Sequence, residues 1–427
     1  MYELRKIGFL PVLIILVTFI STNQWSAVPI GNTTTSWVVC FFAIGCILWN
    51  KSRYFRPYNS RDYRIVGFYF MWMIICVLRG CFAAEDYWDW KQLVMGILAL
   101  SLPVAVYVFS IPDILQTTLR WWLKIALPAF VLFYWFIPRD VFQYYLGPVL
   151  LLGCFLPILT KKWKIILLFF LVLMMTDFGA RSQLLKAIVV VLVGAVYLFN
   201  KYFPVLSVRL LNFALPLCFM VPIVLLTLGI TNVFNPFDSF ASGKDQYETR
   251  VSDSGENENI ADDTRTFIYE EVISSAAQNR YIWLGRTPAR GNDTKAFEKR
   301  EAELKTPKNE RHENEVCHLN VFTWIGLIGL ILYSLIYLRS SYLAINQSNS
   351  IWMKLLGVFI AFRWAFGWIE DFNRFDISNI TLWMIIAMGL SHEYRKMSND
   401  EFEKNILNIF NFKYKFKRSR YRYTDWL

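Results

Sequence analysis

The chain alternates long apolar stretches with short polar connections over most of its length. A helix needs roughly 20 mostly apolar residues to cross a bilayer, and about twelve stretches qualify if a few short ones are accepted. They cover residues 4–22, 36–50, 65–80, 92–110, 121–137, 144–160, 165–177, 183–199, 207–230, 317–338, 351–369 and 377–392. The pattern therefore predicts an all-α integral membrane protein with about 12 transmembrane helices.

The charges of the connections suit the rule that Lys and Arg gather in cytoplasmic loops. Connections that follow even-numbered spans are basic, and they cover residues 51–64, 160–164 and 200–203. Connections that follow odd-numbered spans are acidic or mixed, and they cover residues 85–91, 137–142 and 369–376. Both termini are therefore expected in the cytoplasm.

Two parts of this pattern allow alternatives. The first 20 residues have the basic start of a signal peptide but no convincing cleavage site, so we interpret them as the first span. Residues 165–199 could form one long helix. Because basic residues flank this stretch on both sides, two spans with a turn at residues 176–182 suit the charge rule better.

One connection, residues 231–316, is far longer than the others and follows the ninth span, on the outer side. Loops longer than about 15 residues are usually functional or disordered. Apolar residues at helical spacing predict a helix over 264–280, and a polar surface helix is expected over 294–305. The predicted parts are spans one to nine (1–230), a large periplasmic or extracellular loop (231–316), spans ten to twelve (317–392) and a cytoplasmic tail (393–427).

The composition agrees with a membrane protein. Of the 427 residues, 56% are hydrophobic and only 18% are charged, whereas soluble domains average about 25% charged residues. Part of the net charge of +11 lies in the basic and aromatic tail at residues 413–423. Such a tail can bind nucleic acid, but its nearness to the last span favours anionic lipid headgroups. We therefore expect the lipid bilayer as a partner, and no nucleic acid.

The sequence offers no metal site that we can identify. The seven cysteines are scattered, mostly in apolar stretches, and no CxxC pair is present. Scattered cysteines of this kind usually act as small apolar residues in the packing. The three histidines are not paired at a spacing that suits zinc. We expect neither a metal nor another cofactor.

Arginines on the outer side are candidates for binding phosphate, because a guanidinium group presents paired donors to phosphate oxygens. Arg181 lies at the start of the eighth span, although an arginine at a span end is often only a snorkelling anchor. Arg265 opens the predicted loop helix, so packing would fix its position. Arg286 in the loop and Arg139 after the fifth span are further candidates, with a solvated charged surface as the alternative.

The return from the long loop into the tenth span carries ionisable groups against an apolar run. Glu315 and His318 are three residues apart and would share one face of a helix, while His312 lies farther into the loop. A histidine with a carboxylate partner can take a proton from a hydroxyl group. The alternative is a helix start with Glu near the positive end of the helix dipole and a histidine satisfied in an interface.

Aromatic and acidic residues on the outer side are candidates for binding sugars, since aromatic rings stack on pyranose faces and carboxylates bind hydroxyl groups. Asp86 and Trp88 lie in one such segment, and Glu370 and Asp371 follow the eleventh span. A charge inside a span usually marks function or a paired partner. Arg363, two helical turns before Glu370, could therefore form a structural pair with it.

Three segments resemble motifs of the O-antigen polymerase and ligase superfamily of bacterial surface-polysaccharide assembly (the Wzy and WaaL types). "TDFGARSQLL" is similar to its serine-arginine-glycine segment, although an alanine precedes Arg181. "TRTFIYEEVISSAAQNRYIWLGR" is similar to its loop arginine, helix and glycine. "NEVCHLNVFTWIGLIGLILYS" is similar to its His-Asn segment. The position of the family's histidine, however, falls near Glu315 in this chain, and His312 and His318 lie on either side of it.

The resemblance implies a metal-independent membrane glycosyltransferase in the bacterial inner membrane. A polymerase would transfer a glycan from undecaprenyl pyrophosphate to the next lipid-linked repeat unit. His318, Glu315 and His312 would supply the base or orient the acceptor hydroxyl, and the arginines would stabilise the pyrophosphate. A chain-length regulator and a flippase are implied partners. The alternatives are a ligase that delivers the glycan to lipid A-core and a transporter or flippase of lipid-linked sugars.

Overall fold

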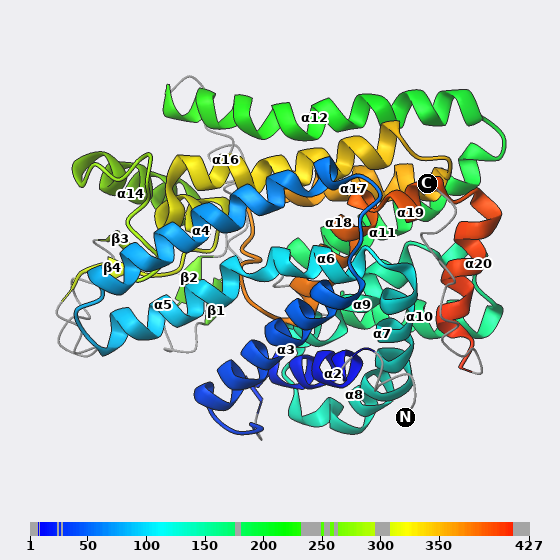
Figure 1. The fold of residues 1–427 in the computed structure, drawn as a ribbon, viewed down its shortest axis with the longest axis horizontal. Coiled ribbons are helices and arrows are strands. Elements are labelled where there is room, and N and C mark those ends of the chain that lie inside the picture. Colours follow the sequence, from blue (N-terminus) through cyan, green and yellow to red (C-terminus); the bar gives the residue numbers. More distant parts are fainter. Residues whose placement is uncertain are drawn as a thin grey trace.

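The structure is a computed structural model that describes residues 7, 9–23, 25–26, 29–175, 181–231, 249–251, 257–259, 264–294 and 308–412. The chain is mostly helical, as Figure 1 shows. The α-helices are α2 Leu10–Ile20, α3 Thr33–Tyr54, α4 Arg64–Ala83, α5 Tyr87–Leu100, α6 Val106–Phe109, α7 Pro112–Trp121, α8 Leu127–Phe133, α9 Phe142–Gly153, α10 Lys161–Met174, α11 Arg181–Asn200, α12 Pro204–Ile230, α14 Thr264–Gln278, α16 Cys317–Asn346, α17 Ile351–Phe366, α18 Ile377–Leu390, α19 His392–Lys396 and α20 Asn399–Phe410. The strands β1 Thr249–Val251 and β2 Asn257–Asn259 pair antiparallel, as do β3 Asn292–Asp293 and β4 Glu310–Arg311.

The prediction of an all-α membrane protein is confirmed at this level. Within the described residues, seven helices are long and apolar enough to cross a membrane. They are Thr33–Tyr54, Ser60–Ala83, Tyr87–Phe109, Pro112–Phe136, Gln183–Asn200, Pro204–Gly229 and Cys317–Asn346. Leu10–Ile20 and Ile377–Leu390 are shorter apolar helices. Each of the twelve predicted stretches contains helix, while the number of spans stays a prediction.

Two predicted boundaries differ from the structure. The span expected at 121–137 belongs to a longer helix, Pro112–Phe136, in which a π-helical turn at Trp122–Ala126 joins α7 to α8. Pro128 follows this turn and cannot donate a backbone hydrogen bond, which explains the local widening. Residues 161–200 form two helices, α10 and α11, as the charge rule predicted, but residues 176–180 between them lie outside the described part.

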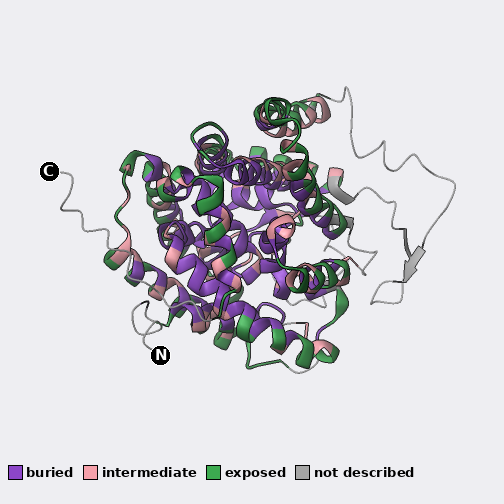
Figure 2. Ribbon diagram, turned by 90° about the vertical axis from the view of Figure 1, so that its right-hand side faces the viewer, coloured by how far each residue is buried: buried purple, intermediate pink, exposed green. Residues whose placement is uncertain are grey.

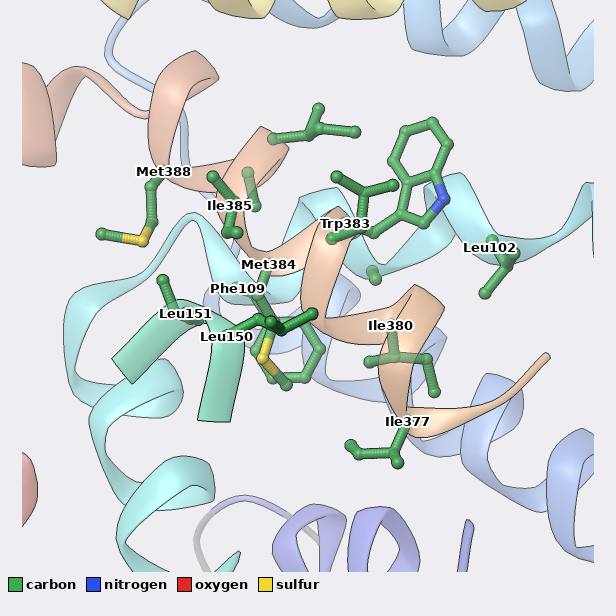
Figure 3. Close-up of a cluster of buried hydrophobic side chains, with 14 of the residues drawn as sticks. Leu102, Phe109, Leu150, Leu151, Ile377, Ile380, Trp383, Met384, Ile385 and Met388 are labelled. Carbon is green, nitrogen blue, oxygen red and sulfur yellow. The ribbon is translucent and has the colours of Figure 1, made fainter. Parts of the chain in front are cut away.

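The core surrounds α18, which packs against α6, α9, α16 and α17. A helix that is apolar all round is stable only when it is buried on every side, and nearly every residue of α18 is buried. Figure 3 shows Ile377, Ile380 and Trp383 of α18 among Leu102 and Leu150. Figure 2 shows the ribbon turned by 90°, with the buried residues central and the exposed ones on the periphery, including those of α12 at the top.

The connections between helices gather at two ends of the bundle. At one end, Ser391 donates to the Ser110 carbonyl at 2.6 Å, and Arg395 pairs with Asp62 at 2.6 Å. At the other end, the Ile377 amide donates to Ser21 at 3.1 Å. The basic connections at 51–64, 160–164 and 200–203 belong to the first end. The acidic or mixed ones at 85–91, 137–142 and 369–376 belong to the second.

The described part of the long connection lies at the second end, where α14, β3 and β4 sit beside α4 and the start of α16 (Figure 1). The helix predicted over 264–280 is confirmed as α14. Ile268 and Val272 of α14 are buried against Val316 and Leu319. Most of the predicted helix at 294–305 lies outside the described residues.

Helix α16 is broken at Gly326, where φ is 70° and ψ is −175°. Residues 282–287 of the long connection fill the break. The Leu327 amide donates to the Ile282 carbonyl at 2.8 Å, and the Arg286 amide donates to the Thr323 carbonyl at 2.7 Å. Gly285, which also has a positive φ, crosses Gly326 so closely that a Cβ atom on either residue would overlap the other backbone. The break and the connection therefore form one unit.

The crossing predicts that Gly326→Ala destabilises the protein. The added Cβ atom must displace the Trp283 carbonyl and the Gly285 amide, and overpacking of this kind costs on the order of 1–3 kcal/mol or more. Gly67→Ala in α4 is the matched control, because a Cβ atom there meets nothing within 4 Å. Thermal unfolding in detergent should show a clear loss for the first variant and none for the second. Equal melting temperatures for Gly326→Ala and the wild type would contradict the crossing.

Candidate functional site

The start of α16 is bonded to the turn between α17 and α18, residues 367–376. The Cys317 amide donates to the Glu370 carbonyl at 3.1 Å, and the His318 amide donates to the Gly367 carbonyl at 3.2 Å. The side chain of Asn373 donates in return to the Cys317 carbonyl at 2.8 Å. These bonds fix the backbone of the turn that carries Glu370 and Asp371.

The Glu370 carboxylate meets two cations from two helices. Lys186 of α11 lies 2.6 Å from Oε1, and Arg363 of α17 lies 3.3 Å from Oε2. Lys186 also donates to Gln143 of α9 at 2.9 Å. All three charged side chains are largely buried. Burying a charge is costly unless it is paired and hydrogen-bonded, so these contacts hold α9, α11 and α17 to the turn.

Three further ionisable residues surround this group, and we refer to the whole as the Glu370 cluster. It consists of Lys186, Arg363, Glu370, Asp371, Arg374 and Asp376. Burial, followed by the charge of Glu313, raises the pKa of Asp371 to about 7. Burial also raises the pKa of Asp376 to about 7. Near neutral pH Asp371 and Asp376 are therefore partly protonated, so the three basic side chains outweigh the three acidic ones and the cluster is net positive.

Several buried polar atoms beside the cluster have no hydrogen-bond partner within the described part of the chain. They are Nη1 of Arg374 and both amide atoms of Gln183. Gln183 lies one turn before Lys186 on α11, and the Arg374 guanidinium stacks on Trp25 with 4.7 Å to the ring centre. Buried polar groups are normally satisfied by protein or water. Unsatisfied groups next to net positive charge are suited to an anionic ligand.

The predicted base residues occupy three different environments. His318 is 0% exposed, and its Nε2 lies 2.8 Å from the Trp364 carbonyl. Since a carbonyl can only accept, Nε2 carries the proton. Glu315 precedes α16, which begins at Cys317, and its side chain is exposed. The expectation that Glu315 and His318 share a helix face is therefore wrong, because the helix starts two residues after Glu315.

His312 lies before α16 and is partly exposed. Burial lowers the pKa of His312 below its usual value, so the ring is neutral near pH 7. Its Nδ1 is buried without a partner among the described residues. Next to it, Glu313 has an exposed side chain, but the protein around its carboxyl group still raises its pKa.

The predicted arginines also differ. Arg181 and Arg265 are the first and second residues of α11 and α14, and their side chains lie outside the described part. Arg286 pairs with Asp293 at 2.7 Å and with Glu310 at 3.0 Å. Arg286 thus joins the residues around β3 and β4. Arg139 is exposed in the turn before α9, at the same end of the bundle.

Hydrogen bonds within the protein fix the acidic residues that were predicted to bind sugars. Asp86 caps α5 by accepting from the Trp88 amide at 2.8 Å and the Asp89 amide at 3.0 Å. These capping bonds lower the pKa of Asp86. Trp88 is exposed in the first turn of α5. Asp371 accepts from the side chain of Asn320 at 3.2 Å, which links the cluster to α16.

Lys186 was not among the residues selected from the sequence, although a signal was present. It is a lysine inside the eighth predicted span, and a charge there usually has a partner or a function. Its partners, Glu370 and Gln143, are remote in sequence, so neither could be assigned before the fold was known.

We also searched the described residues for a metal site and for cavities. Among the described residues, no group of three or more His, Cys, Asp or Glu side chains could hold a metal ion. A cavity of about 880 Å³ opens at the first end of the bundle, where Arg53, His392 and Lys396 line it. It is separated from the Glu370 cluster by the length of α18, about 20 Å. Comparison of the chain with known protein families, characterised proteins and solved structures found no match.

The pairing in the cluster predicts unequal effects of its substitutions. Glu370→Leu leaves Lys186 and Arg363 as buried cations without their shared carboxylate, and breaking a buried pair costs on the order of 3–5 kcal/mol. Lys186→Met should cost less, because Glu370 keeps Arg363 as a partner. Lys161→Met, which removes an exposed lysine of α10, should change little.

Thermal unfolding of the purified variants in one detergent measures these differences. We expect the melting temperature to fall in the order Lys161→Met, Lys186→Met, Glu370→Leu. If Glu370→Leu melts with the wild type, the carboxylate does not hold the two cations.

Proposed function

We propose that this chain is a polysaccharide polymerase of the bacterial inner membrane, acting on O-antigen, capsule or exopolysaccharide. It transfers a glycan from undecaprenyl pyrophosphate to the next lipid-linked repeat unit. The observation that carries the proposal is the net positive Glu370 cluster at one end of a bundle of apolar helices. The proposal includes twelve spans, both termini in the cytoplasm and the Glu370 cluster on the outer side.

The cluster is suited to the pyrophosphate group of a lipid carrier. A lipid-linked donor keeps its isoprenoid chain in the bilayer and its pyrophosphate near the helix ends, which is the level of Lys186 and Arg363. Guanidinium and ammonium groups in a water-poor site stabilise charge that develops on a leaving group. In this proposal the side-chain cations of the cluster, Lys186 and Arg363, take that task.

Residues of the Glu370 cluster can account for both the leaving group and the proton of the reaction. The acceptor hydroxyl oxygen attacks the anomeric carbon, and the bond from that carbon to the pyrophosphate oxygen breaks. The electron pair leaves with undecaprenyl pyrophosphate, whose added charge Lys186 and Arg363 stabilise. The hydroxyl proton passes to a base. Asp371 is the best candidate, because its pKa of about 7 suits proton transfer near neutral pH.

In this proposal His318 is a positioning residue. Its ring is enclosed by Trp364, Trp368 and Phe372, and its backbone amide holds Gly367. It therefore fixes the turn that presents Glu370 and Asp371. His312, neutral and with an unpartnered Nδ1, is the second candidate for the base.

A transporter of lipid-linked sugars is the second candidate function, and one observation favours it. Helix α16 is broken at Gly326, and discontinuous helices form the substrate sites of many transporters. In this chain, however, the break is filled by residues 282–287 of the same chain. A ligase would use the same donor and the same cluster but a different acceptor.

The test is glycan transfer by the purified protein in nanodiscs with lipid-linked repeat units. Asp371→Asn keeps an oxygen that can accept from Asn320 but removes the base, so we expect turnover to fall by roughly 100-fold or more. Asp113→Asn, in α7 at the opposite end of the bundle, is the matched control and should retain wild-type turnover. Wild-type activity should rise with pH to a plateau above about 7, since the base acts when deprotonated.

Near-wild-type turnover for Asp371→Asn at normal folding would remove Asp371 as the base. Loss of transfer in His312→Ala alone would then move the proton transfer to the loop. Absence of transfer by the wild-type protein, together with uptake of lipid-linked repeats into sealed vesicles, would support the transporter instead.

A further inference from the structure

Residues 281–287 run against two apolar helices, α4 and α16. The carbonyl of Leu284 accepts from Arg79 of α4 at 2.7 Å, and the carbonyl of Ile282 accepts from the Leu327 amide of α16 at 2.8 Å. Both α4 and α16 belong to helices long and apolar enough to cross a membrane. We propose that Ile282, Trp283 and Leu284 form a wedge that is embedded among the acyl chains of the bilayer.

The carbonyl groups of the wedge are all bonded to the protein. Each of four successive carbonyls, Ile282 to Gly285, accepts a hydrogen bond from the protein. The donors are the amides of Leu327 and Ile328 and the guanidinium of Arg79, which binds both Leu284 and Gly285. Carbonyl groups at membrane depth need such partners, because acyl chains offer no hydrogen-bond donor. A loop in water has no such need.

The contacts also give the depth of the wedge. Leu284 lies level with Cys76, whose sulfur is 3.7 Å from the Leu284 carbonyl oxygen. Cys76 is seven residues before the end of α4 at Ala83, which corresponds to about 10 Å along a helix. Gly326 is nine residues inside α16, or about 14 Å. Both helices therefore place the wedge roughly 10 Å or more from their ends, within the length that a hydrocarbon core about 30 Å thick would cover.

The side chains of the wedge extend an apolar surface that the two helices already expose. Trp283 is 63% exposed and Leu284 is 46% exposed. On α4, Leu78 and Phe82 are exposed, and on α16 Ile331 is exposed. Water would penalise so much adjacent apolar surface, whereas acyl chains cover it at no cost.

A nitroxide label at Leu284→Cys tests the wedge in nanodiscs that contain phospholipid and no lipid-linked sugar. The seven native cysteines are replaced by alanine or serine. Leu78→Cys on α4 is the control for a lipid-facing position, and Glu85→Cys in the polar turn after α4 is the control for water. We expect the label at 284 to match the one at 78. Both labels should be far more accessible to oxygen than to a water-soluble nickel chelate. Their accessibility to the nickel chelate should be several-fold lower than that of the label at 85.

Nickel accessibility at 284 equal to that at 85 would overturn the proposal by placing the wedge in water. Low accessibility to both reagents would also overturn it and indicate coverage by a second copy of the chain. Because removal of seven cysteines can impair folding, a second measurement uses the native cysteines. The fluorescence of Trp283 is obtained as the difference between the wild type and Trp283→Phe. This difference should be quenched by brominated phospholipids and not by iodide, and the reverse result would overturn the proposal.

Discussion

The cost of burying charge explains most of the arrangement at the second end of the bundle. Lys186 and Arg363 lie on helices whose other neighbours are apolar, so each needs a carboxylate, and one carboxylate, Glu370, serves both. Glu370 can do so only because the start of α16 holds its backbone through the Cys317 amide. Three helices and one turn are therefore fixed together by a group of charges that an apolar environment would otherwise exclude.

The second constraint is that backbone groups away from water must be paired. The break of α16 at Gly326 releases backbone groups, and residues 282–287 of the long connection bond to them. The same segment carries Arg286 to its partners Asp293 and Glu310. The connection is consequently attached to the bundle at a fixed height, and α14 packs beside the first turn of α16.

Much of the fold follows from the sequence, because apolar length and the charge of short connections are local properties. They predicted the apolar helices, and the apolar spacing within the long connection predicted helix α14. The cluster was only half predictable. Glu370 and Arg363 are seven residues apart and were considered as a structural pair, whereas Lys186 reaches Glu370 only in the folded chain. The break at Gly326 depends on Gly285, forty-one residues earlier, and the burial of His318 depends on aromatic residues of α17 and the turn after it.

The central claim is that the Glu370 cluster serves glycan polymerisation. The most direct measurement is the length distribution of the surface polysaccharide made by cells that lack this chain. The account predicts that such cells attach a single repeat unit to the acceptor, and that expression of the chain restores the polymer. Bare acceptor together with lipid-linked polymer would identify a ligase, and repeat units trapped in the cytoplasm would identify a flippase; either result would contradict the account.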